Sequence, residues 1–345
     1  MNSKYYKKNE ISFLFWNVLA DVYIKYYDKK YSNLKTYDSE HLLKPLELNY
    51  NLRQSRILGH INMLKPSIIG LIEIQEDTYQ YLANNLSNNY FFSEIYCDEL
   101  DQDKKDYNFP KEGKCVLWKK ELNLTGIDIK CINSAFGRKI LDFNFKYLGK
   151  KIHYIVHHNS PVYMYSVDKN GEYLNPEFHK YDNIYNDSDS ELNQIVEIHP
   201  GIYKKFIRGG AIACLEGLVE YINNNIDDKC IVFIGGDFNS QPSYPKVKKS
   251  HIPEYIDKIK FNLDDLHSYK IDKTFFSLRH DGRRLDYIFY DKTKVISKYI
   301  KPITPPCYKN LITNYNNKDI RRLNYNYQVM HYGSDHQPIF GIFLI

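Results

Sequence analysis

The sequence predicts a four-layered α/β fold, in which two β-sheets pack face to face and helices cover their outer faces. Strand-like apolar runs outnumber segments with helical spacing, and each half of the chain combines several such strands with flanking helices. No internal repeat or linker divides the 345 residues, so we expect a single domain over residues 1–345. Periodicity does not determine the order of the strands.

The first half of the chain alternates strands with two helices. Residues 12–18 and 68–74 are continuous apolar runs and are predicted to be buried strands. Residues 52–64 have helical spacing, and this helix ends before Pro66, because proline disfavours helical backbone in the preceding residue. Asp77 is predicted to cap the next helix. Further strands are expected at residues 91–96, 115–118, 125–131, 140–147 and 152–157.

The second half contains one clear helix. Residues 206–223 carry apolar side chains at helical spacing. The polar stretches 163–197 and 299–327 are expected to be long surface loops. Strands are expected at residues 230–234, 285–290 and 339–345.

The composition is that of an ordinary globular protein. Apolar residues make up 43%, enough for a sizeable core, and charged residues make up 26%. The net charge is only +5, so a basic surface for nucleic acid has to come from local clustering. The 33 tyrosines indicate first a coding bias, and second a set of platforms on which bases stack.

The cysteines and the N-terminus favour an intracellular protein. None of the six cysteines forms a C-x-x-C pair, and several lie in apolar runs, which is typical of buried free thiols in a reducing compartment. The first residues contain no long apolar segment of a secretory signal, and no apolar run approaches the roughly 20 residues of a membrane helix. We therefore expect a cytoplasmic or nuclear protein that does not bind membranes.

Polar side chains lie at the ends of several predicted strands. They are Asn17, Glu73, His157, His158, Asp237, Asn239, Asp286, Asp335 and His336. Such groups at buried strand ends are costly unless a cation or mutual hydrogen bonds compensate them. Carboxylates that converge at one sheet edge repel one another, and a hard divalent cation relieves the repulsion. Oxygen ligands suit Mg²⁺ or Mn²⁺.

The segment GGDFNSQP is the most informative of these strand ends. Gly235 and Gly236 allow a sharp turn, and Asp237 and Asn239 then project to the same side. The alternative is an Asx turn with a capping aspartate. Pro242 stiffens the exit from the segment.

The segment GSDHQP adds a carboxylate, Asp335, directly beside a titratable base, His336. The alternative is a turn with a surface histidine. Taken singly, Asn17, Glu73 and Asp286 also have ordinary explanations as turn residues or residues on a solvated face.

The chain resembles the endonuclease/exonuclease/phosphatase superfamily over nearly its whole length. The resemblance lies in the order of the residues at the strand ends, which is Asn, Glu, His, Asp-x-Asn, Asp and Asp-His. Within the superfamily, WNVLAD, NYNLRQSRILGHINMLKPSIIGLIEIQED, EGKCVLW and GGDFNSQPSY are most similar to the deadenylase and nocturnin-like branch. The resemblance implies a four-layered sandwich of two mixed sheets and hydrolysis of phosphoric esters with Mg²⁺ or Mn²⁺.

The resemblance also implies a role for each site residue. Metal ligands are expected to be Asn17, Glu73 and Asp335. Catalytic residues are expected to be His158, Asp237, Asn239, Asp286 and His336. In this scheme Asp286 orients His336, Asp237 positions or deprotonates the attacking water, and His158 contacts the phosphate.

Two segments depart from the family pattern. Ile72 precedes Glu73, where the family usually has glutamine. The triplet Val156-His157-His158 stands where the deadenylase branch carries Asn-Thr-His, and it is more similar to the deoxyribonuclease I and phosphatase branches. The choice between the two histidines stays open, with His158 preferred because a strand that ends at His157 would point that side chain inward.

The substrate is predicted less sharply than the chemistry. Arg208, Lys246 and Arg284 are candidate contacts to a phosphodiester backbone, with a solvated charged rim as the alternative for each. RNA is the expected substrate, and a 3′-exonuclease the expected activity, because of the deadenylase-like start. A DNA endonuclease comes second and a phosphatase of a small phosphate ester third. An inactive nucleic-acid-binding protein of the same fold is the alternative from another class.

Overall fold

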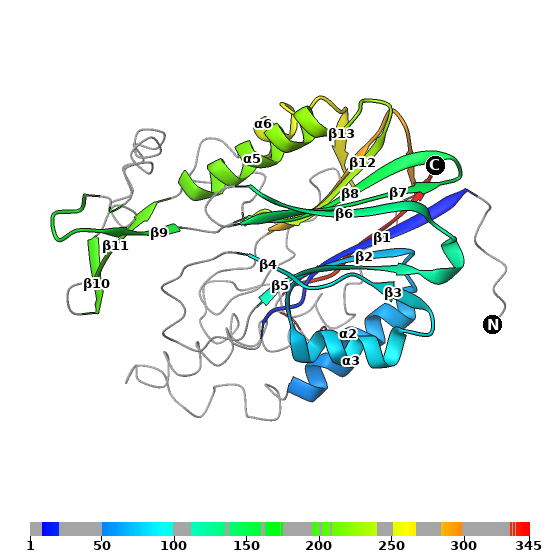
Figure 1. Ribbon diagram of the computed structural model, residues 1–345, viewed down its shortest axis with the longest axis horizontal. Coiled ribbons are helices and arrows are strands. Elements are labelled where there is room, and N and C mark those ends of the chain that lie inside the picture. Colours follow the sequence, from blue (N-terminus) through cyan, green and yellow to red (C-terminus); the bar gives the residue numbers. More distant parts are fainter. Residues whose placement is uncertain are drawn as a thin grey trace, which may run out of the picture.

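Two large β-sheets pack face to face in the computed structural model, and helices lie on their outer faces (Figure 1). This four-layered arrangement of two mixed sheets confirms the predicted fold class. The structure describes residues 9–20, 50–98, 112–134, 138–159, 163–172, 174, 195–199, 202–207, 209–239, 251–266, 284–298, 332, 334 and 336–345.

The first large sheet has the strand order β15-β16-β1-β2-β5-β3, and β4 also pairs with β5. β1 and β2 are parallel, whereas the other described pairs of this sheet are antiparallel. Its strands are β1 (Glu10–Asn17), β2 (Ile68–Gln75), β3 (Tyr90–Phe92), β4 (Tyr96–Cys97), β5 (Glu112–Lys119), β15 (Ile296–Lys298) and β16 (Ile339–Leu344).

The second large sheet has the order β13-β14-β12-β8-β7-β6 and repeats the same pattern. Its central pair, β8 and β12, is parallel, and the flanking described pairs are antiparallel. Its strands are β6 (Thr125–Asn133), β7 (Lys139–Tyr147), β8 (Lys150–His158), β12 (Ile231–Asp237), β13 (Leu263–Asp265) and β14 (Asp286–Asp291).

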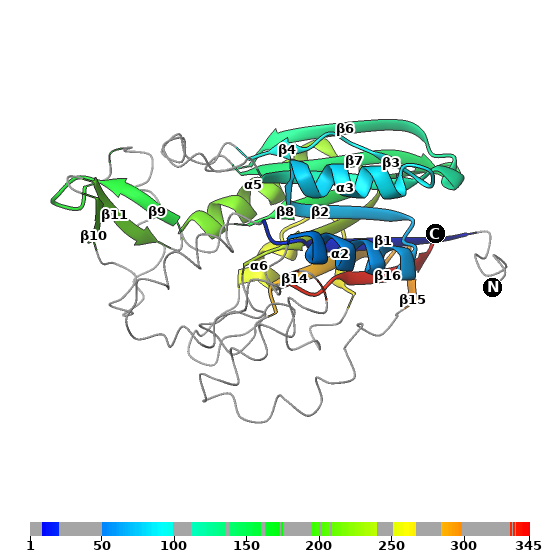
Figure 2. The same cartoon turned by 90° about the horizontal axis from the view of Figure 1, so that it is seen from below.

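Helices cover the outer face of each large sheet. α2 (Tyr50–Leu64) and α3 (Glu76–Leu86) lie along the first sheet (Figure 2), and α5 (Gly209–Asn225) and α6 (His251–Ile256) cover the second. A 3₁₀ turn, η3 (Lys120–Leu122), follows β5. No helix among the described residues is long and apolar enough to cross a membrane.

A small third sheet lies beyond the N-terminal end of α5 (Figure 1). Its three strands are antiparallel and have the order β10-β11-β9. They are β9 (Tyr163–Val167), β10 (Ile195–His199) and β11 (Ile202–Ile207).

Side-chain alternation divides the central strands between an inner core and two outer cores. In β1, Phe13 and Phe15 pack between the sheets, whereas Leu14 and Trp16 pack toward α2 and α3. The ring of Phe13 stacks on that of Phe233 from the opposite sheet, with centroids 4.2 Å apart. Because both faces of these strands are buried, their sequences are continuous apolar runs, which is why the sequence identified them.

The two sheets approach each other closely around Tyr154. A Cβ at Gly70 or Gly235 would lie 2.8 or 2.6 Å from the Tyr154 hydroxyl, so both positions require glycine. The hydroxyl donates to the Leu14 carbonyl at 3.1 Å, which satisfies a buried polar group between the sheets.

Several local predictions are wrong. Residues 163–197, expected to be a loop, include β9 and the start of β10. The helix predicted from Phe206 begins at Gly209, because Phe206 belongs to β11. Asp77 lies in the first turn of α3, whose N-cap is Gln75. The strand predicted at 91–96 is split between β3 and β4, and α6, β13 and β15 were not predicted.

These errors share a physical cause. The missed elements are three to six residues long, too short for a periodic pattern to identify, so pairing and packing with neighbours define them. The predicted loop at 299–327 lies outside the described residues. The five described cysteines are free thiols, and Cys115, Cys214 and Cys230 are buried, as expected.

Candidate active site

Polar side chains from six strand ends meet at one edge of the packed sheets. β1 and β2 are parallel, as are β8 and β12, so the C-terminal ends of each pair lie at the same edge. β14 and β16 are antiparallel to their neighbours and therefore begin at this edge. The side chains are Asn17, Glu73, His158, Asp237, Asp286 and His336.

Strand register places three of these residues side by side. Asp237 of β12 is paired with His158 of β8 on one side and with Asp286 of β14 on the other. Residues directly opposite on neighbouring strands project to the same face. Ile288, two residues after Asp286, packs between the sheets, so this face is the one turned toward the first sheet.

Glu73 is an exception to strand alternation. Ile72 already packs between the sheets, so a regular strand would turn Glu73 toward the helices. The pairing of β2 with β5 shifts between Ile72 and Ile74, and Glu73 has a φ of 54°. A register shift of this kind re-aims a side chain. Positive φ is uncommon for a residue with a Cβ and marks stored strain.

The Asn17 amide links the two sheets at the centre of the site. Its Nδ2 donates to Glu73 Oε1 at 2.8 Å and to Asp237 Oδ2 at 3.2 Å, and lies 3.4 Å from His336 Nε2. Its Oδ1 accepts from the Leu19 N–H at 3.0 Å. Asn17 is therefore held from both ends, and it fixes the separation of the two carboxylates.

His336 and Asp286 form a buried pair. His336 Nδ1 lies 2.8 Å from Asp286 Oδ2, so the carboxylate accepts a hydrogen bond from the ring. Nε2 then faces the site and lies 3.8 Å from Asp237 Oδ2. The backbone of His336 is also held, since its N–H donates to Ser334 Oγ at 3.1 Å and its carbonyl accepts from Trp16 Nε1 at 3.0 Å.

Asp237 is almost fully buried, and burial raises its pKa to about 7. The nearby His336 opposes the rise, and Asp286 adds to it. Asp237 Oδ1 accepts from the Asn239 N–H at 2.8 Å, and Asn239 Nδ2 donates to the Asn159 carbonyl at 2.7 Å. The carboxylate therefore has a fixed orientation and exchanges its proton near neutral pH.

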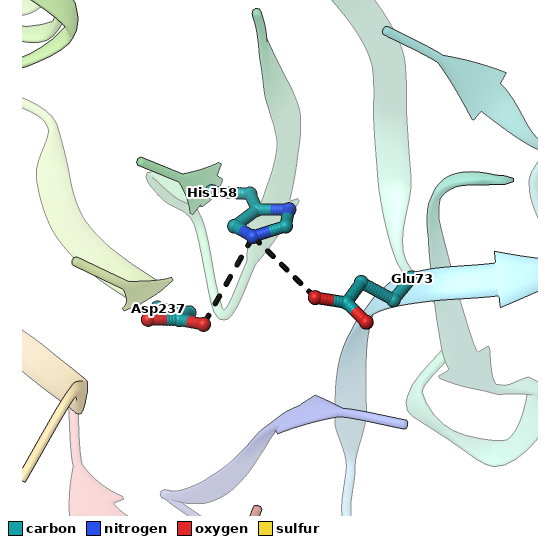
Figure 3. Close-up of side chains that lie close together, drawn as sticks. All are labelled: Glu73, His158 and Asp237. Carbon is teal, nitrogen blue, oxygen red and sulfur yellow. Dashed lines mark ion pairs between the residues drawn. The ribbon is translucent and has the colours of Figure 1, made fainter. Parts of the chain in front are cut away.

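The two adjacent histidines point to opposite faces of β8. His158 Nε2 lies 3.6 Å from Glu73 Oε1 and 3.9 Å from Asp237 Oδ2 (Figure 3). His157 faces away, with its ring centroid 5.3 Å from that of Phe238, and burial lowers its pKa to about 3. The geometry thus brings His158, and not His157, to the other site residues.

Three charged residues beside the site were not predicted from the sequence: Asp98, Lys114 and Arg138. Lys114 and Arg138 are buried and both pair with the carboxylate of Asp98, and Arg138 also contacts His158. Burial raises the pKa of Asp98, but the charges of Lys114 and Arg138 overcome this and hold it below its usual value. Burial, then the charge of Arg138, lowers the pKa of His158 well below its ordinary value. The one feature of the sequence that could have indicated these residues is the lysine, Lys114, inside the largely apolar strand EGKCVLW.

The site residues fit a divalent cation. Ligand atoms of Glu73, His158 and Asp237 all lie within 4.8 Å of one another, as do those of Asp237, Asp286 and His336. Carboxylate oxygens are the ligands that Mg²⁺ and Mn²⁺ prefer. Burial raises the pKa of Asp237, and a cation beside its carboxylate would offset the cost of burying the charge.

The remaining predicted residues fall into two groups. Asp335, Arg208 and Lys246 lie outside the described residues. Arg284 is only 1% exposed, and its Nη2 lies 2.6 Å from both oxygens of Asp265. Asp265 thus holds the guanidinium of Arg284 in the interior, with its Cζ 4.3 Å from the centre of the Tyr287 ring, and the substrate contact expected for Arg284 stays a prediction.

No protein-family model and no curated protein matches the chain. Solved structures do match over almost its whole length. ANGEL2, a 2′,3′-cyclic phosphatase solved with adenosine-2′,3′-vanadate, has a TM-score of 0.57 and 14% identity, covering 99% of this chain and 97% of that chain. An endonuclease/exonuclease/phosphatase from Bacteroides vulgatus has a TM-score of 0.57 and 13% identity, covering 97% of this chain and 99% of that chain.

The human nocturnin catalytic domain with a bound sulfate anion has a TM-score of 0.54 and 14% identity, covering 97% of this chain and 93% of that one. Identities this low show the fold. The chain has the endonuclease/exonuclease/phosphatase fold, as the sequence resemblance implied, and a nocturnin structure is among its neighbours.

Proposed function

We propose that this protein is a single-domain, divalent-metal-dependent phosphodiesterase that hydrolyses RNA from its 3′ end. The observation that carries the proposal is the meeting of Glu73, Asp237, His158 and the His336–Asp286 pair at one sheet edge. Solved structures with this fold support it, since they include a phosphatase bound to adenosine-2′,3′-vanadate and a catalytic domain bound to sulfate.

Asp237 is proposed to take a proton from the attacking water. Its Oδ1 is held by the Asn239 N–H and its Oδ2 by the Asn17 amide, so the carboxylate keeps one orientation in the site. Burial raises the pKa of Asp237, so its carboxylate is a stronger base than that of an exposed aspartate.

His336 is proposed to hold a proton close to the negative charge that develops on the phosphate. Asp286 accepts from Nδ1, which fixes the ring orientation and stabilises the imidazolium form. Nε2 is then the atom available to the reacting group, and it lies 3.8 Å from Asp237 Oδ2. We propose that His336 transfers the proton at Nε2.

His158 and Asn239 are proposed to hold the phosphate. His158 presents Nε2 between the carboxylates of Glu73 and Asp237 (Figure 3). A donor at this position stabilises a non-bridging oxygen most strongly when its charge is greatest, in the transition state.

Glu73 and Asn17, with Asp335 as a further proposed ligand, would hold Mg²⁺ or Mn²⁺ beside His158 and Asp237. When bound, the cation neutralises charge on the phosphate oxygens.

RNA is the proposed substrate because the start of the chain resembles the deadenylase and nocturnin-like branch, and because nocturnin shares the fold. Arg208 and Lys246 remain proposed contacts to the phosphodiester backbone. The cytoplasm or the nucleus is the proposed compartment.

An assay with labelled substrates tests the proposal. Purified protein with Mg²⁺ or Mn²⁺ is given poly(A) RNA, mixed-sequence RNA, single- and double-stranded DNA, and an inositol phosphate. We expect stepwise shortening of RNA from the 3′ end, reduced roughly 10²- to 10⁴-fold in Asp237→Asn. The matched control is Asp257→Asn, since Asp257 directly follows α6 and is exposed.

The other outcomes reject parts of the proposal. Cleavage of DNA, or release of phosphate from the small ester, would reject RNA as the substrate but keep the hydrolytic chemistry. Binding of nucleic acid with no turnover of any substrate would favour an inactive nucleic-acid-binding protein.

A further inference from the structure

A buried network of charged side chains lies behind His158, on the side away from Glu73. Asp98 accepts hydrogen bonds from Lys114 Nζ, from Arg138 Nη1 at 2.8 Å and from the Lys139 N–H at 2.8 Å. Arg138 Nη1 also lies 3.2 Å from His158 Nδ1. The side chains of Lys114, Asp98 and Arg138 are 1%, 6% and 7% exposed.

The network joins the two large sheets. Asp98 follows β4 and Lys114 lies in β5, both in the first sheet, whereas Arg138 directly precedes β7 in the second. β7 pairs with β8 in the register Leu141 to Val156, which brings the start of β7 beside the end of β8 at His158. The contact with His158 therefore depends on the first sheet holding Arg138 in place.

Two buried cations, Lys114 and Arg138, both pair with the carboxylate of Asp98. Burying charges is costly, and a buried ion network is weak evidence for a gain in stability. A role at the adjacent site accounts for the arrangement better than stability does.

The contact with Arg138 determines which ring nitrogen of His158 carries the proton. A guanidinium has only donors and stays protonated in proteins, so Nδ1 of His158 has to be the acceptor. The ring is then neutral with its proton on Nε2, the atom that faces Glu73 and Asp237. His336 is the opposite case, since its Nδ1 donates to Asp286.

We propose that Arg138, held by Asp98 and Lys114, is a positioning residue that fixes His158 as a neutral hydrogen-bond donor through Nε2. His158 and His336 thus differ in the ring nitrogen that carries the proton of the neutral form, and His158 is the one that presents an N–H to the site through Nε2. The consequence for turnover rests on the proposed function, but the tautomer itself does not.

Nuclear magnetic resonance of the full chain with ¹⁵N-labelled histidines tests the tautomer at neutral pH. The His158 signals are identified by their absence in His158→Gln. We expect the wild type to show a single tautomer with the proton on Nε2 and Arg138→Met to lose this preference. Arg138→Met leaves the Lys114–Asp98 pair in place.

Turnover of whichever substrate the protein accepts gives a second measurement. Loss of a partner that orients an active-site histidine lowers activity roughly 10- to 100-fold, and we expect this for Arg138→Met. Arg138→Lys keeps a cationic donor and should recover part of the loss. Arg56→Met, on the exposed face of α2, is the matched control and should behave as the wild type.

Two results would overturn the proposal. One is a wild-type His158 with its proton on Nδ1, which is decisive even if Arg138→Met does not fold. The other is a folded Arg138→Met variant that keeps both the tautomer and the turnover of the wild type. If no substrate is turned over, the proposed function fails, but the tautomer still tests the network on its own.

Discussion

Replacement of His157 by leucine should stabilise the protein, although the residue adjoins the candidate active site. His157 is fully buried, and neither of its ring nitrogens has a hydrogen-bond partner among the described residues. It faces Phe238 and the core beneath α5, not the site. Leucine has a similar volume and no polar atoms, so it removes the unsatisfied groups without leaving a large cavity.

The size of the effect follows from this burial. Unsatisfied buried polar groups cost about 1–3 kcal/mol, so His157→Leu should gain about that much free energy of unfolding near neutral pH. For 345 residues the entropy of unfolding is about 0.7 kcal/mol per kelvin, so the melting temperature should rise by about 1–4 °C.

The gain should increase as the pH falls. Burial lowers the pKa of His157 from 6.5 to about 3, so between these values the unfolded chain binds a proton that the folded protein does not. The part of the wild-type free energy of unfolding that depends on neutral His157 is therefore fully present above about pH 6.5, and it is lost progressively as the pH falls below that value. Each pH unit is worth about 1.4 kcal/mol, so at about pH 5 the substitution should gain about 2 kcal/mol more.

Denaturant unfolding of both proteins at about pH 7.5 and about pH 5, with activity measured in parallel, tests this. The adjacent substitution His158→Leu is the comparison, and it should abolish activity, whereas His157→Leu should retain it. A variant that is destabilised at both pH values, with no pH dependence in the difference, would refute the reasoning, because His157 would then be making hydrogen bonds that leucine cannot replace.

Three further predictions concern the metal, the pH and the packing of the sheets. Mg²⁺ at a hundred times its Kd should raise the free energy of unfolding of the wild type by about 2.7 kcal/mol, measured in thermal melts. Glu73→Gln should lose this gain. A gain of the same size in Glu73→Gln would show that the cation binds elsewhere. Because the pKa of Asp237 is raised to about 7, a metal ion that binds below that pH must displace a proton. The affinity of the protein for Mg²⁺, measured by titration calorimetry, should therefore fall about tenfold for each pH unit below about 7. An affinity that does not change between about pH 5 and 7 would contradict this. Gly235→Ala should lower the free energy of unfolding by about 1–3 kcal/mol, since the new Cβ would lie 2.6 Å from the Tyr154 hydroxyl. Gly59→Ala, with open space around it, should be neutral or stabilising by about 0.5–1 kcal/mol. Equal melting temperatures for the two variants would argue against tight packing at Gly235.

The central strands could be predicted because they are buried on both faces. β1, β2 and β12 are continuous apolar runs that end in a polar residue, and the polar residue marks the sheet edge. The strands β9, β13 and β15 could not be predicted in this way, because they are short and their pairing with neighbours defines them. The pairing of Arg284 with Asp265 could not be predicted for a related reason, since Asp265 lies on β13 and local sequence cannot show the pair.

The sequence by itself determined the fold class and the residues that gather at the site, because residue type and alternation are local properties that a strand carries with it. Asn17, Asp237 and Asp286 reach the space between the sheets in this way. Two features depended on tertiary structure. The inward turn of Glu73 requires the shifted pairing of β2 with β5, and the orientation of His158 requires Arg138 held by Asp98 and Lys114 from the opposite sheet. Both arise from contacts between segments far apart in the chain, which no local pattern specifies, so only packing of the two sheets decided them.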